Sequence, residues 1–542
     1  MIFKNLKSIF YSGLIAIILT GCGATNIVST PIENIDSVSP KITELTKEEQ
    51  KTWGHDDLMQ DTVPGISLDR AYSEIIGSKK GKKVIVAVID SGMDLLHEDL
   101  DDVIWVNKDE IANNGKDDDN NGYVDDIHGY NFLGESYNEQ LEYVRMQRLN
   151  IGGEAVLAKA KVKRDKAYIE ASENKEQYEQ ILELVSQADI NIKEHLGKEA
   201  YTKEEVMAIA STDPTIMRSV SVLGQMFNIA ETIPEVIKEL NEGLDHFSDQ
   251  INYHLNVDFN GREIVGDNAY DFNDRDYGNG NPQNRVETES HGTHVAGIIG
   301  AERNNNIGIN GVANNVEIMS VRAVPNGDEY DKDIALAIRY AVDNGAKVIN
   351  ASFGKGFSPN SEWVYEALQY AAEKDVLFVH GAGNDGLDLD DPENPSFPND
   401  QKSLNAGEFI DSFVSVGALT MDYGSEMVAS YSNYGKINVD IYAPGSDIYS
   451  TMPGNEYSFQ SGTSMASPVV AGVAALIRSY YPKLSASDVK EVLLQSGLSS
   501  KTIVILDDDT SKAKSFSEIS TSGKMVNAYN ALILADKKSK NL

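Results

Sequence analysis

The chain has 542 residues, of which 41% are hydrophobic, so it is long and apolar enough for a sizeable core and for more than one domain. Its formal net charge of -37 argues against binding to nucleic acid or to anionic lipid surfaces through electrostatics. The single cysteine, Cys22, excludes an intramolecular disulfide.

The first 22 residues have the pattern of an export signal. Two early lysines precede an apolar run, Ile9–Leu19, that is too short for a comfortable membrane span. The run ends in Leu-Thr-Gly-Cys, which resembles a bacterial lipobox, and the resemblance implies that Cys22 is acylated. We therefore expect residues 1–22 to be a lipoprotein signal peptide and the protein to be exported to the bacterial cell envelope, lipid-anchored to a membrane. An ordinary signal peptide, or an N-terminal anchor with an incidental cysteine, is the alternative.

Residues 23–62 are expected to form a tether and a lead-in to the folded part. Up to about residue 50 the sequence is rich in Ser, Thr, Pro and Asn and then in charge, which predicts a flexible connection. The segment Ser67–Ile76 then has the pattern of a helix with Ser67 as its N-cap.

The first strong strand pattern is the continuous apolar run Val84–Ile89. Such a run is typical of a strand that is buried on both faces of a parallel sheet. Asp90 follows at the carboxyl end of this strand, where α/β sheets place functional groups. A turn-forming role before Ser91 and Gly92 is the other interpretation of Asp90.

An acidic segment rich in Asn and Gly comes next. Asp117, Asp119 and Asn121, followed by a glycine, match the first half of an EF-hand-type calcium loop. The twelfth position of such a loop is His128 in place of the usual glutamate, so the site is incomplete unless other ligands reach it. Structural calcium near these residues and an acidic surface turn both stay open.

Residues 134–256 differ in character from the rest of the chain. They are charged and rich in Ala, Glu and Lys, and they lack Gly and Pro from Glu154 to His195, which predicts helix. Further helices are expected at Lys203–Ala210, Thr215–Ala230 and Pro234–Leu255. This insertion is either a helical hairpin or bundle that covers a cleft or binds an unknown partner, or a tolerated surface insertion.

Strand and helix patterns follow in the remaining part. Apolar runs predict strands at Val316–Ala323, Val376–His380 and Phe413–Gly417. Helical patterns are found at Asp331–Asn344, Ser485–Gln495 and Val526–Ala535.

Two short motifs supply an imidazole and a hydroxyl. His291 opens one predicted helix, and His294 completes an H-x-x-H pair that lacks a third metal ligand, so we expect His294 to pack within the helix. The segment 461–468, with the sequence SGTSMASP, places Ser464 where a turn becomes a helix, near the positive end of the helix dipole. Judged on the serine alone, an N-cap on a buried helix is the simpler interpretation.

These motifs together resemble the subtilisin-like serine proteases, the subtilases. Asp90, His291 and Ser464 stand in the family's Asp, His, Ser order. Gly381–Asn384 looks like the family's oxyanion-hole segment, and Lys347–Gly354 looks like its substrate-binding strand. The resemblance implies an α/β fold, the subtilisin-like three-layer fold with a mainly parallel central sheet, interrupted by the α-helical insertion.

The catalytic domain is then expected in two parts, residues 63–133 and 257–537, on either side of the insertion at 134–256, with a tail at 538–542. Between Cys22 and the first strand no alternation of strand and helix patterns is found. We therefore expect no folded inhibitory propeptide. We also expect no separate C-terminal domain.

The resemblance also implies roles for individual residues. His291 would take the proton of Ser464, Asp90 would accept the other ring N–H, and the Asn384 amide with the Ser464 backbone N–H would bind the oxyanion. The residues expected to bind an extended peptide substrate are Ser352, Phe353, Gly354, Ala382 and Gly383. No cofactor is required for this chemistry, and no catalytic metal is expected.

The expected function is that of an exported, membrane-anchored serine endopeptidase that cleaves peptide or protein substrates through an acyl-enzyme. The residues expected to bind the substrate carry no charge, which favours an apolar or broad preference. The alternative is a catalytically latent or non-catalytic subtilase-fold protein that binds a partner through the insertion. A dead enzyme would be expected to have lost one of its four catalytic residues, and none is lost.

Overall fold

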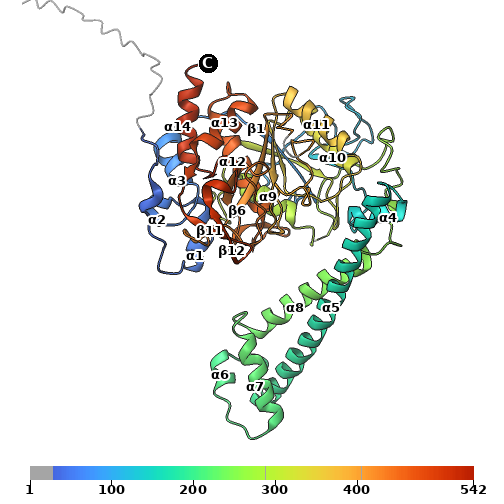
Figure 1. Ribbon diagram of the computed structural model, residues 1–542, viewed down its shortest axis with the longest axis vertical. Coiled ribbons are helices and arrows are strands. Elements are labelled where there is room, and N and C mark those ends of the chain that lie inside the picture. The colour runs from blue at the N-terminus through green and yellow to red at the C-terminus, as the bar shows by residue number, and fades with distance from the viewer. Residues whose placement is uncertain (1–28, 287, 404–405) are drawn as a thin grey trace, which may run out of the picture.

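The computed structural model describes residues 29–286, 288–403 and 406–542 (Figure 1). The expected signal peptide and Cys22 lie outside these residues. Within the described ranges, no helix is both long enough and apolar enough to cross a membrane.

A nine-stranded sheet forms the centre of the body, as we call the described residues outside 134–256. Its strand order is β10-β13-β7-β6-β5-β4-β1-β3-β2, and neighbouring strands are parallel except for β10 and β13. The strands of the sheet are β1 Val84–Asp90, β2 Gly129–Asn131, β3 Val316–Arg322, β4 Val348–Ala351, β5 Leu377–Gly381, β6 Phe413–Leu419, β7 Ile441–Pro444, β10 Leu498–Ser499 and β13 Lys524–Met525. Two separate hairpins pair β8 Ile448–Met452 with β9 Glu456–Gln460, and β11 Ile503–Leu506 with β12 Asp509–Ser515.

Helices cover both faces of this sheet. Side chains alternate between the faces of a strand, so Val86 and Val88 of β1 enter one core while Ala87 and Ile89 enter the other. The first core includes α9 His291–Gly300, α12 Thr463–Tyr480, α13 Ala486–Ser496 and α14 Ala528–Ser539. The second includes α10 Asp331–Asp343 and α11 Ser361–Glu373. The predicted three-layer α/β fold is therefore confirmed.

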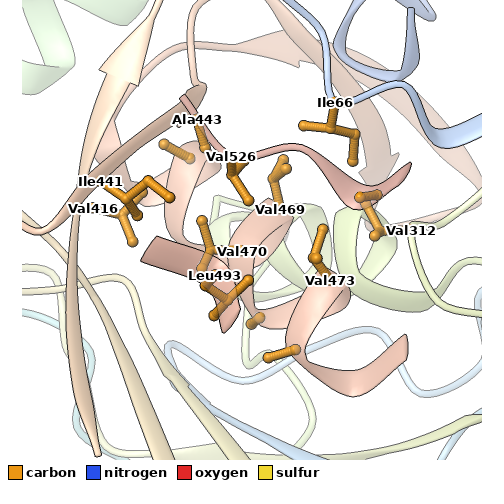
Figure 2. Close-up of a cluster of buried hydrophobic side chains, with 14 of the residues drawn as sticks. Ile66, Val312, Val416, Ile441, Ala443, Val469, Val470, Val473, Leu493 and Val526 are labelled. Carbon is orange, nitrogen blue, oxygen red and sulfur yellow. The ribbon is translucent and has the colours of Figure 1, made fainter. Parts of the chain in front are cut away.

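Helix α12 runs through the middle of the first core. Figure 2 shows Val469, Val470 and Val473 of this helix among apolar side chains from the sheet and from neighbouring helices. Gly472 permits close packing, because a Cβ atom there would lie only 2.6 Å from the Cβ of Val312. Burying each valine contributes about 1.5–3 kcal/mol. The start of α12 is thus held firmly against the sheet.

The described part of the expected tether packs on the body. The backbone N–H of Ile32 donates to Asn530 Oδ1 of α14 at 2.8 Å, and Asn530 Nδ2 donates to the Ile32 carbonyl at 3.0 Å. Ile35 and Trp53 are also buried in the first core. Around Ile32 and Ile35 the segment therefore packs against the body, although its polar composition predicts a flexible connection.

Short helices complete this N-terminal segment: α1 Lys47–Gln50, α2 Leu58–Asp61 and α3 Leu68–Arg70. The helix predicted at Ser67–Ile76 is present as α3 and a following π-helical turn, Ala71–Ile76. Ser67 has a φ of 55° and caps no backbone N–H with its side chain. Its Oγ instead accepts a hydrogen bond from Asn527 Nδ2 at 2.9 Å.

The insertion leaves the body as a long helical arm (Figure 1). Its helices are α4 Glu142–Leu149, α5 Glu154–Leu196, α6 Lys203–Met207, α7 Pro214–Met226 and α8 Ile233–Asp249. The 43 residues of α5 give a length of about 65 Å, and α7 and α8 pack back along it. A small core at the tip joins Ile192 of α5, Leu223 of α7 and Val236 of α8. The predicted α-helical character of the insertion is confirmed.

A buried ionic cluster fastens the base of the arm to the body. Glu142 of α4 accepts from Arg145 Nη2 at 2.5 Å and from Lys355 Nζ at 2.9 Å, and Lys355 also lies 2.9 Å from Asp331. Burial alone would raise the pKa of Glu142, but the charges of Arg145 and Lys355 lower it to about 2. Since Lys355 directly follows Gly354, the arm is tied to the predicted substrate-binding segment.

Candidate active site

The carboxyl ends of three neighbouring strands bring the candidate residues to one edge of the sheet. Ile89 of β1 pairs with Ala351 of β4, so the next residues, Asp90 and Ser352, leave the two strands side by side. Neighbouring strands lie about 4.8 Å apart. On the other side of β4, strand β5 ends just before Asn384. Residues that are far apart in the sequence therefore meet at this edge of the sheet.

Asp90 is buried and pairs with His291 at the start of α9. Asp90 Oδ1 lies 2.8 Å from His291 Nδ1 and also accepts from the Ser91 backbone N–H. The His291 side chain stays 37% exposed, so a substrate can reach its other nitrogen. Burial opposes protonation of the ring, but the Asp90 carboxylate outweighs this effect and raises the pKa of His291 above its usual value. This pair has the arrangement of an imidazole base held by a carboxylate.

Ser464 lies in the first turn of α12, beside the end of β4. Its Oγ donates to the Ser352 carbonyl oxygen at 3.2 Å, and Ser352 Oγ donates to the Ser464 carbonyl oxygen at 2.8 Å. Among the described residues, no hydrogen bond joins Ser464 to His291. Catalytic hydrogen bonds often tighten only when substrate binds. Chemistry that uses His291 as the base requires the hydroxyl to rotate away from Ser352.

Asn384 and the start of α12 place two N–H donors beside Gly462. Asn384 Oδ1 accepts from the backbone N–H and the Oγ1 of Thr463, both at 2.9 Å, which fixes the amide. Its Nδ2 donates to no group in the described part of the chain. The Ser464 N–H lies in the first helical turn, where the helix itself offers no acceptor. A Cβ on Gly462 would lie 3.3 Å from Asn384 Nδ2 and 3.5 Å from Ser464 N, so glycine keeps open the space between these two donors.

A cavity of about 720 Å³ adjoins Ser464 and Asn384. Four of the predicted substrate-binding residues line it: Ser352, Phe353, Gly354 and Gly383. Gly383 has a φ of 103°, and a Cβ there would lie 2.4 Å from Asn433 Nδ2, so only glycine fits. Ala382 does not line the cavity. It is 1% exposed and its N–H donates to the Val416 carbonyl within the sheet, so Gly381 lines the cavity in its place.

Residues of the arm form part of the same cavity, which agrees with the cleft-covering alternative for the insertion, although the sequence did not indicate which residues take part. Tyr143 of α4 and both Lys159 and Lys163 of α5 line it. Lys159 Nζ pairs with Glu393 on the opposite wall at 2.9 Å. Lys163 lies over the Tyr143 ring and, among the described residues, forms no ion pair.

His294 is buried in α9, as expected for a packed helix residue. Its Nε2 lies 3.1 Å from the Ser458 carbonyl oxygen, and burial lowers its pKa to about 3. His294 therefore contributes to the packing of α9 against the β8–β9 hairpin.

The EF-hand pattern is only partly reflected in the structure. Asp117 closes a turn by accepting from the backbone N–H groups of Asn121 and Gly122. Asp119 instead lies with Glu110 and Asp126, two residues that the pattern did not include. Calcium near Asp117, Asp119 and Asn121 therefore stays a prediction, and the structure adds Glu110 and Asp126 to the acidic groups near Asp119.

Comparison with known proteins agrees with this geometry. The profile of the "Subtilase family" matches residues 81–518. The chain is 43% identical over 227 residues to the thermophilic serine proteinase of Bacillus sp. strain AK1, covering 42% of this chain and 49% of that protein. It is 39% identical over 218 residues to thermitase of Thermoactinomyces vulgaris, covering 40% and 68%.

A third relative is the cell wall-associated protease of Bacillus subtilis, 39% identical over 216 residues, or 40% of this chain and 22% of that protein. The chain thus spans about half or less of the length of two of these relatives. The family match nevertheless covers most of the chain and includes β1, α9 and α12. The chain therefore belongs to the subtilase family.

Proposed function

We propose that the protein is a serine endopeptidase that hydrolyses peptide bonds with Asp90, His291 and Ser464 as its triad. The observation that carries the proposal is the geometry at the ends of two neighbouring strands. Asp90 ends β1 and lies 2.8 Å from His291 Nδ1, and Ser352, which follows β4, contacts Ser464. Family membership and the names of the relatives support the same chemistry.

The mechanism follows from the positions of these groups. His291 Nε2 takes the proton as Ser464 Oγ attacks the substrate carbonyl carbon, and Asp90 stabilises the imidazolium. The carbonyl oxygen becomes an oxyanion between Asn384 Nδ2 and the Ser464 N–H. His291 then protonates the leaving amine, which breaks the C–N bond and leaves an acyl-enzyme. Water, deprotonated by His291, hydrolyses the ester and restores Ser464.

The arm, in this proposal, restricts which substrates reach Ser464. Its base supplies one wall of the cavity, and the Lys159–Glu393 pair joins that wall to the opposite loop. An unfolded peptide can enter such a cleft as an extended strand, whereas a folded protein surface meets the arm first. The arm would therefore favour small or flexible substrates.

The N-terminal motif supports export and lipid attachment through Cys22. Ile32 is already held by α14, so the link from Cys22 can span at most about 35 Å. Helix α14 and the α6–α7 tip lie toward opposite ends of the long axis of the molecule (Figure 1). On a membrane, the arm would then point away from the lipid surface. Cys22→Ser should move the protein to the soluble exported fraction or leave it unprocessed, and a variant that still fractionates with membranes would contradict the anchor.

Proteolysis by purified variants tests the proposed activity. Ser464→Ala should lower kcat/KM on a fluorogenic peptide at least about a thousandfold with unchanged thermal unfolding. Ser461→Ala is the matched control and should retain activity, since the only partner of this exposed hydroxyl among the described residues is Asp447. Near-normal hydrolysis by folded Ser464→Ala would refute the mechanism, and an inactive wild type would favour the latent or non-catalytic alternative.

A further inference from the structure

The cavity beside Ser464 contains charged side chains, some of which come from the arm. The substrate-binding residues expected from the sequence are uncharged, whereas six charged residues line the cavity in the structure. These are Lys159, Lys163, Asp328, Lys355, Asp385 and Glu393. What each of them can offer to a substrate depends on whether it already has a partner within the protein.

Four of the six are engaged within the protein. Lys159 Nζ pairs with Glu393 at 2.9 Å. Lys355 is buried and pairs with Glu142, whose backbone N–H donates to Asp328 Oδ2 at 2.7 Å. These four groups are therefore held by contacts inside the protein.

The two remaining groups lie on different walls of the cavity. Across the described ranges, neither Lys163 nor Asp385 forms an ion pair. Asp385 directly follows Asn384, and a Cβ on Gly383 would lie 3.9 Å from Asp385 Oδ2. Lys163 belongs to α5 of the arm. The cavity is thus negative beside Asn384 and positive on the arm wall.

The Lys163 ammonium lies against two aromatic rings that line the cavity. Its Nζ is 5.4 Å from the centre of the Tyr143 ring and 5.8 Å from that of Phe357, and ring faces attract cations. A Cβ on Gly356 would lie 3.8 Å from Lys163 Nζ and 3.5 Å from the Pro395 carbonyl oxygen. Gly356 and Pro395 also line the cavity, so the ammonium faces it.

We propose that Lys163 binds a carboxylate of the substrate and gives the enzyme a preference for glutamate immediately before the cleaved bond. This inference rests on the proposed peptidase function. Gly356 follows Ser352, the contact of Ser464, by four residues, which span at most about 14 Å in an extended chain. A side chain that enters beside Ser464 must extend toward Gly356 to meet the ammonium, so glutamate fits better than the shorter aspartate.

This preference differs from the apolar or broad one expected from the sequence, because that expectation did not include the arm. The net charge of -37 repels acidic substrates at long range. Exposed charges farther away than about 8–10 Å are largely screened at physiological ionic strength, so the direct contact with Lys163 outweighs them once the peptide is in the cavity.

Hydrolysis of matched peptides by the full chain tests the role of Lys163. The peptides are acetylated and carry Glu, Gln or Lys joined to a fluorogenic coumarin amide, so the cleaved bond is fixed and the Glu side chain is the only carboxylate. The kcat/KM of the parent should be at least about tenfold higher for Glu than for Gln. Lys163→Met should bring this ratio close to one, and Lys163→Arg should preserve it. Lys166→Met is the matched control, since Lys166 is exposed on the same helix, pairs with Glu170 at 3.6 Å and does not line the cavity.

Binding of the same peptides to Ser464→Ala protein separates this inference from the proposed function. Without cleavage, the Glu peptide should bind at least about tenfold more tightly than the Gln peptide, and adding Lys163→Met should remove the difference. If the wild type hydrolyses no peptide, the proposed function fails and these affinities decide the inference. Equal affinities for Glu and Gln, or a Glu/Gln ratio that Lys163→Met leaves unchanged, would overturn the role of Lys163. A parent that prefers the Lys peptide would also contradict it, because Asp385 would then dominate the cavity.

Discussion

The body and the arm are stabilised in different ways. The body has two extensive cores, one on each face of its sheet, and α12 lies deep in the first. The arm has two small cores, one at the tip and one at the base, and most of α5 is solvent-exposed. Its surface carries i,i+4 ion pairs such as Lys161–Asp165 and Lys166–Glu170, which contribute only a few tenths of a kcal/mol each.

In the proposed mechanism, the body carries out the chemistry and the arm controls which substrates reach the site. The proposed catalytic groups lie on the body, at strand ends and helix starts. The arm touches the site only at its base, through the cavity wall and the Glu142–Lys355 cluster. Changes in the body should therefore affect all substrates equally, whereas changes in the arm should distinguish large substrates from small ones.

Among changes to the residues that assist Ser464, Asp90→Asn is expected to have the largest effect. The amide would hold the wrong tautomer of His291, so kcat should fall by about ten-thousandfold while the fold is kept. The loss should be the same for casein and for a short peptide. A variant that loses activity on only one of these two substrates would contradict the assignment of chemistry to the body and of substrate access to the arm.

Asn384→Ala should have the next largest effect. Loss of its Nδ2 leaves the Ser464 N–H as the remaining donor at Gly462, and kcat should fall roughly a hundred- to a thousandfold with little change in KM. That range comes from the corresponding donor in a subtilisin. Steady-state kinetics on the peptide provide the measurement, and a change confined to KM would contradict the role.

The pH dependence tests the electrostatics of the body. His291 acts as a base only when neutral, and the Asp90 carboxylate raises its pKa above the usual value of about 6.5. The rate should therefore fall as the pH falls, with a midpoint in kcat/KM above about 6.5 and a loss of about tenfold per unit below it. A midpoint at or below 6.5 would be inconsistent with the Asp90–His291 pair.

Shortening the arm should have the smallest effect, and one that depends on the substrate. Gly243 of α8 lies against Tyr178 of α5, so residues 179–242 can be replaced there by a short Gly/Ser turn that keeps the cavity wall and Glu142. Cleavage of a folded protein should rise several-fold more than cleavage of the peptide. Equal rates on both substrates before and after shortening would identify the outer arm as a passive insertion or a docking element.

Much of the body could be predicted from the sequence. Continuous apolar runs marked β1, β3, β5 and β6, because strands buried on both faces leave that pattern. The places of Asp90, His291 and Ser464 at strand or helix ends could be predicted because their motifs lie beside a clear strand or helix pattern. Gly462 and Asn384 belong to the same motifs. Glycine at 462 leaves space between two N–H donors, and Asn384 supplies one of these donors.

Other features depend on contacts that spacing along the chain does not encode. Ile32 and Ile35 are isolated apolar residues in a polar segment, and only the surface of the body reveals their partners. Lys159 lies on a helix with no motif, and its place in the cavity follows from where α5 leaves the body. Glu110 and Asp126 join Asp119 only after the loop has folded.

Covalent labelling tests the central claim most directly. The wild-type protein, treated with a fluorophosphonate probe and digested for mass spectrometry, should carry a single adduct on Ser464. His291→Ala should slow the labelling strongly, and Ser461→Ala should not change it. No adduct on Ser464 in folded wild-type protein, or equal labelling of Ser464 with and without His291, would contradict a catalytic site on the body of this subtilase.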